Sequence, residues 1–152
     1  MIDGGIAMKA DKKRLEFLKK DAVQGFTRTI GLKPVSLKPG EFITRIKLEK
    51  HLCQQDGFVH AGVIAAMADH TAGYACYSLI PESHRILSVE FKISYLKPAS
   101  GKYLECKAWV TKPGKLILFT EADVFSVEGK VKNLVARAMH TMASVPRAKI
   151  AK

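Results

Sequence analysis

One long apolar segment without proline, between Gly57 and Pro81, constrains the fold more than any other feature of this chain. It is rich in Ala, Val, Ile and Met. This composition predicts a helix of about five turns over residues 60–80. Its only carboxylate, Asp69, has small residues three and four positions away on the same helical face: Ala65, Ala66, Ala72 and Gly73. The helix is the only segment large and apolar enough to cover one face of a sheet.

The remaining segments mostly alternate between apolar and polar residues, as half-buried strands do. Residues 33–50 predict a hairpin around Lys38-Pro39-Gly40. After Pro81, four strands are predicted over residues 86–96, 102–111, 116–126 and 131–144, with turns at 97–101, 112–115 and 128–130. The alanines of the last segment also allow a helix, but the tight turn before it favours a strand.

The N-terminal part predicts a short amphipathic helix over residues 8–20, with Leu15, Phe17 and Leu18 on its apolar face. A loop between Gly25 and Gly31 follows. The order of helix, hairpin, long helix and four antiparallel strands predicts the α+β class. We expect one domain over residues 1–152, with its core at about 30–145.

Composition narrows the function classes. The chain has 152 residues, of which 47% are hydrophobic, so a packed core is expected. We find no signal-peptide core and no apolar run of membrane-spanning length, which predicts a cytoplasmic protein with no membrane partner. Three cysteines, Cys53, Cys76 and Cys106, match no zinc or redox spacing.

The formal net charge is +11. A soluble, self-repelling surface, a nucleic-acid partner, and a phosphorylated ligand or acidic carrier protein are three alternatives. Basic residues are spread along the chain and no nucleic-acid-binding motif is present, so the prediction is no nucleic-acid partner.

A local motif around the start of the predicted long helix gives a more specific indication of function. The chain carries Gln54, Gly57, His60-Ala61-Gly62 and then Asp69, nine positions after the histidine. This pattern resembles the hotdog-fold acyl-CoA thioesterases of the phenylacetate-pathway type, which have an amide residue, a glycine, His-Gly-Gly and an acid at these places. Two departures are Ala61 for the first glycine and Gln54 where many members have Asn. Ser88–Ala99 resembles the strand that ends in a proline turn in that family.

The resemblance implies hydrolysis of an acyl-CoA thioester. Asp69 would be the base for water or the direct nucleophile; alternatively, it is an ordinary helix aspartate bonded to nearby backbone or a lysine. The amide of Ala61, at the predicted helix N-terminus, would stabilise the oxyanion, with Gly62 beside it.

Gln54, or the adjacent Gln55, would act on the carbonyl; a solvated loop glutamine is the alternative. His60 would orient that loop or cap the helix, and Ser88 would position water. Neither a thiol nucleophile at Cys53 nor a metal held by His51, His60, Asp69 and His70 is expected.

The family also implies a homodimer or homotetramer, in which the acid of one subunit faces the amide loop of the other. By the same analogy, Arg85 and basic residues near Lys97 would contact the phosphates of coenzyme A. No cofactor or metal is expected, because coenzyme A is part of the substrate. Acyl-carrier protein is an alternative handle, and a non-catalytic acyl-CoA-binding module, such as a ligand sensor, is the alternative function.

Overall fold

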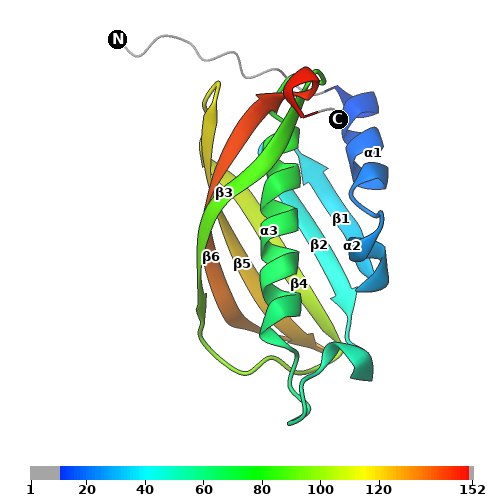
Figure 1. Ribbon diagram of the computed structural model, residues 1–152. Coiled ribbons are helices and arrows are strands. Elements are labelled where there is room, and N and C mark those ends of the chain that lie inside the picture. Colours follow the sequence, from blue (N-terminus) through cyan, green and yellow to red (C-terminus); the bar gives the residue numbers. More distant parts are fainter. Residues whose placement is uncertain (1–10, 151–152) are drawn as a thin grey trace.

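The computed structural model describes residues 11–150, which form an antiparallel sheet curled around one long helix, α3 (Figure 1). The six strands lie in the order β1-β2-β4-β5-β6-β3. The elements are α1 (Lys12–Asp21), α2 (Phe26–Thr29), β1 (Leu32–Lys38), β2 (Glu41–Lys47), α3 (Ala61–Tyr77), β3 (His84–Tyr95), β4 (Tyr103–Lys112), β5 (Ile117–Glu128) and β6 (Val131–Pro146). The predicted α+β class is confirmed, and the fourth late segment is a strand.

Helix α3 lies against the concave side of the sheet, as predicted (Figure 1). Its sheet-facing side chains are fully or almost fully buried; they include Ile64, Met67, Ala68, Ala72 and Ala75. The alanines let the helix approach the strands closely, and the helix ends at Tyr77, before Pro81. Within residues 11–150, no helix has both the length and the apolar character needed to cross a membrane.

The pairing of β3 differs from the simple succession of hairpins that the turn signals predict. Strand β3 pairs with β6 rather than with β4, so it forms one edge of the sheet. Residues 97–101 are therefore not a hairpin turn but a connection to β4, and the Ala99 carbonyl accepts a hydrogen bond from the Val59 amide on its way. The alternation expected of this strand is broken by an irregularity between Ser88 and Glu90.

The N-terminal helix is α1, and residues 8–10 of its predicted range lie outside the described residues. Asp11 caps it by accepting a hydrogen bond from the Arg14 amide. Leu18 is buried, but Phe17 is 55% exposed, so its assignment to the packed face is wrong.

The predicted loop between Gly25 and Gly31 is also wrong, because it contains the short helix α2. The hydroxyl of Thr27 stabilises this turn by donating to the Ala22 and Gln24 carbonyls. Thr27 is buried in α2, which ends before β1 begins at Leu32.

Candidate active site

Asp69 lies in the middle of α3 and its carboxylate is held by β3. The Ser88 hydroxyl donates a hydrogen bond of 2.6 Å to Asp69 Oδ1. Asp69 is half-buried, and among residues 11–150 no lysine or arginine forms an ion pair with it. The structure thus brings together two residues that lie 19 positions apart in the chain. The remaining lone pairs of the carboxylate can accept hydrogen bonds from a ligand or from water.

A buried histidine beside this pair was missed by the sequence reasoning. His140 on β6 is 2% exposed, and neither ring nitrogen has a hydrogen-bond partner among the described residues. Its ring stacks on Phe91, with centroids 5.3 Å apart. Burial lowers the pKa of His140, and the nearby Asp69 carboxylate opposes this by raising it. Alternation along β6 is the sequence signal that could have indicated the burial of His140, because Ala138, His140 and Met142 share the core-facing side of the strand.

The buried histidines predict that acid destabilises the fold. Burial lowers the pKa of both His70 and His140 in the folded chain below the usual value of about 6.5. The unfolded chain therefore binds more protons below about pH 7, so the free energy of unfolding falls as the pH decreases through this range.

Urea unfolding at about pH 7.5 and 5.5 measures this loss. His140→Gln should show a smaller loss than the wild type, whereas a variant of the exposed His51, His51→Gln, should retain the full loss. If His140→Gln lost as much unfolding free energy as the wild type between these two pH values, His140 would not be a source of the acid sensitivity.

The N-terminus of α3 offers a free backbone donor at Ala61. His60 is the N-cap, and its ring nitrogen Nδ1 accepts a hydrogen bond of 2.9 Å from the Gly62 amide. The Ala61 amide has no hydrogen-bond acceptor among residues 11–150. On its other side, the Tyr95 hydroxyl donates to the Ala61 carbonyl at 3.1 Å and ties β3 to the helix start. Two roles are expected of His60, to orient the Gln54 loop or to cap the helix, and in the structure it caps the helix.

A tight loop precedes this helix start and carries Gln54. The backbone N–H of Gln54 donates to the backbone carbonyl of Phe58 at 2.8 Å. The backbone N–H of Gly57 donates to the backbone carbonyl of Gln54 at 3.0 Å. The Gln54 side chain is half-buried and makes no hydrogen bond with the described residues. By contrast, the side chain of Gln55 is exposed and donates to Asp56. The side-chain amide of Gln54 is therefore better suited to contact a ligand than that of Gln55.

Within one chain Asp69 and Ala61 lie far apart along α3. Asp69 follows Ala61 by about two helical turns, which is roughly 12 Å along the axis. One thioester carbonyl cannot contact both groups over that distance, because its oxygen and its attacked carbon are bonded to each other. The Asp69 carboxylate and the Ala61 amide of a single chain therefore do not act on the same thioester carbonyl.

The remaining histidine and cysteine side chains of α3 and β4 do not form a reactive site. His70 contacts the Ala22 carbonyl through Nε2 at 2.8 Å, and its ring lies 4.8 Å from that of Tyr74. Burial raises the pKa of both Cys76 and Cys106 to about 12. Among residues 11–150, no three His, Cys, Asp or Glu side chains gather as a metal-binding group.

Comparison with known proteins finds a matching family model, a similar curated protein and similar solved structures. The family model of the thioesterase superfamily matches residues 56–132. A 1,4-dihydroxy-2-naphthoyl-CoA hydrolase from Listeria monocytogenes is 25% identical over 91 residues, which cover 60% of this chain and 74% of that hydrolase. A solved thioesterase family protein from Silicibacter pomeroyi is 29% identical with a TM-score of 0.83, over 87% of this chain and 98% of that one.

The PaaI protein of the Escherichia coli phenylacetic acid degradation operon has the same fold. Its TM-score is 0.77 over 93% of this chain and 96% of that protein, at 16% identity, which bears on the fold alone. The hotdog fold expected from the sequence is thereby confirmed, with its long helix and six-stranded antiparallel sheet.

Proposed function

Because this chain belongs to the thioesterase superfamily, we propose that it hydrolyses an acyl-CoA thioester to a free acid and coenzyme A. The observation that carries the proposal is the Asp69 carboxylate. It is half-buried, forms no ion pair among residues 11–150, and accepts a 2.6 Å hydrogen bond from Ser88. Such a group can take a proton from water or attack a carbonyl itself.

In the proposed reaction Asp69 removes a proton from water, and the resulting hydroxide attacks the thioester carbon. The carbonyl oxygen becomes an oxyanion, which the free Ala61 amide stabilises together with the dipole of α3. The carbon–sulfur bond then breaks, and the thiolate leaves with the proton that Asp69 holds. Direct attack by Asp69 is the alternative; it forms an anhydride that water hydrolyses. Ser88 orients the carboxylate in either case.

We infer that two copies of the chain assemble each site. Two features support this: the separation of Asp69 from Ala61, and the outer edge of β3, which pairs with no strand among residues 11–150. Large apolar side chains are exposed along that strand, with Leu87 46%, Val89 60% and Phe91 42% exposed. A long apolar edge of this kind suits pairing with another strand. Pairing of β3 with its symmetry mate would form a homodimer that supplies Asp69 from one copy and Ala61 from the other.

Gln54→Ala should lower kcat more than it raises KM. In the proposal, the Gln54 amide bonds to the carbonyl oxygen, whose charge grows in the transition state. Steady-state kinetics measures the two constants separately. Gln55→Ala is the matched control and should leave both constants within about twofold. A loss that appears in Gln55→Ala instead would move the role by one residue.

A thiol-release assay on a panel of acyl-CoAs, run beside equilibrium binding, tests the proposed function. We expect release of coenzyme A that depends on enzyme concentration, for at least one acyl group. Tight binding of acyl-CoAs without release of the thiol would instead identify a non-catalytic binding module and overturn the proposal.

A further inference from the structure

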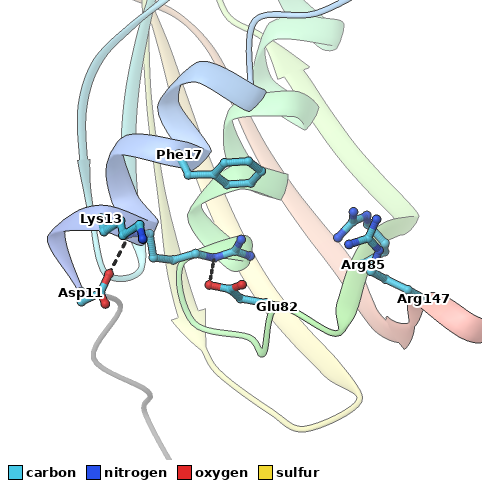
Figure 2. Close-up of a pocket in the computed structure, with 7 residues that line it drawn as sticks. Asp11, Lys13, Phe17, Glu82, Arg85 and Arg147 are labelled. Carbon is cyan, nitrogen blue, oxygen red and sulfur yellow. Dashed lines mark hydrogen bonds and ion pairs between the residues drawn. The ribbon is translucent and has the colours of Figure 1, made fainter.

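A basic cavity of about 450 Å³ lies between α1, the start of β3 and the residue that follows β6 (Figure 2). Its cationic lining residues are Lys13, Arg14, Arg85 and Arg147, and its carboxylates are Asp11 and Glu82. In Figure 2 the side chains of Arg85 and Arg147 extend toward the same part of the cavity. Nothing in the proposed hydrolysis uses these groups.

The two carboxylates do not neutralise this cluster. Asp11 is engaged at the start of α1, where it accepts from the Arg14 amide at 2.7 Å. Glu82 is 73% exposed and lies 4.0 Å from the Arg14 guanidinium, whose own side chain is only 12% exposed. An ion pair this long with such an exposed partner contributes little. A largely buried guanidinium is therefore left with weak compensation.

Arg85 and Arg147 have still fewer partners. Arg85 donates to the carbonyl of its neighbour His84 at 3.1 Å, and neither arginine forms an ion pair with residues 11–150. Yet the backbone holds them close, because Arg85 pairs with Val145 across the strands. The Arg147 amide also donates to the Ser83 carbonyl at 2.8 Å. Like charges fixed side by side favour an anion between them, and guanidinium groups suit phosphate oxygens.

We infer that this cavity binds the phosphate groups of the substrate's handle, an inference that rests on the proposed function. Arg85 precedes Ser88 by three residues on β3, so it lies about 10 Å along the strand from the residue that holds Asp69. Coenzyme A carries its phosphates at the end opposite its sulfur. A phosphate site must therefore lie at a distance from the reacting carbonyl, as this cavity does.

Two thioesters with the same acyl group test the inference: the coenzyme A thioester and the N-acetylcysteamine thioester, which has no phosphate. The variant with both Arg85→Gln and Arg147→Gln should raise KM for the coenzyme A thioester about tenfold or more. Its kcat, and its KM for the truncated thioester, should stay within about twofold of the wild type. The single variant of the exposed Arg147, Arg147→Gln, should show part of the effect and Arg147→Lys less.

Arg28→Gln removes an exposed arginine on α2 and serves as the control for net charge. It should leave both KM values unchanged. An equal rise in KM for the two thioesters would overturn the inference, as would the same rise in Arg28→Gln. Thermal unfolding of each variant shows whether the fold is intact, and Arg147→Gln alone decides the matter if the double variant does not fold.

Calorimetric titration of the full chain with adenosine 3′,5′-bisphosphate separates this inference from the proposed function, since it requires no hydrolysis. We expect binding that the double variant weakens about tenfold or more, and competition with the coenzyme A thioester. Equal affinity in both proteins would overturn the site. Binding without competition would overturn the link to the handle and identify a separate phosphorylated ligand as the source of the anion.

Discussion

Asp69→Asn is expected to keep its fold and to lose at least about a hundredfold in turnover. The amide has nearly the size of the carboxylate and can still accept the hydrogen bond from Ser88 Oγ. It cannot take a proton from water at neutral pH, and it is a poor nucleophile. The loss should therefore appear in kcat, with KM changed little.

Single-turnover thiol release measures this loss, and circular dichroism checks the fold. Glu121→Gln on the outer side of β5 removes another carboxylate and should retain wild-type turnover. Turnover of Asp69→Asn within a few-fold of the wild type would remove Asp69 from the chemistry. Ser88→Ala should give a smaller loss, because it only releases the carboxylate from its hydrogen bond.

Ala61→Pro should lower kcat by about two to three orders of magnitude, as the loss of one oxyanion donor does. Proline has no backbone amide hydrogen, so the substitution removes the proposed donor itself. It suits the fold, because Ala61 is the first residue of α3, a position that favours proline. His60 before it is extended, with φ −61° and ψ 132°, the conformation that proline requires of its predecessor.

Ala61→Gly is the matched control, because it retains the amide hydrogen. Its turnover should stay within about threefold of the wild type, and thermal unfolding should find both variants folded. If Ala61→Pro hydrolyses thioesters as fast as Ala61→Gly does, the oxyanion donor lies elsewhere.

The sequence predicts the elements of this fold well but not the arrangement of β3. Alternation indicates each strand and turn residues indicate each hairpin, and both are local signals. The pairing of β3 with β6 joins His84 to Pro146, and no local pattern encodes so distant a contact. The turn predicted at residues 97–101 is instead a connection between non-adjacent strands, because a proline turn signal occurs in hairpins and in longer crossings alike.

The candidate site shows the same division. Asp69 and Ala61 could be singled out because a carboxylate in an apolar helix and a helix start are visible in the chain. The Asp69–Ser88 contact depends on how α3 packs on β3, and the sequence singles out Ser88 only through the family resemblance, as a residue that would position water. His140 escaped notice because a histidine in an alternating strand looks like any other core-facing residue. The basic cavity depends on three chain segments that meet only in the folded protein.

The most direct test of the account is complementation between Asp69→Asn and Ala61→Pro chains that are refolded together. In random mixing about half the dimers contain one chain of each kind, and each of these has one intact site of two. Activity should therefore recover to about a quarter of the wild-type value, while each variant alone stays inactive. Mixed dimers detected by native mass spectrometry that remain inactive would contradict a site shared between two copies.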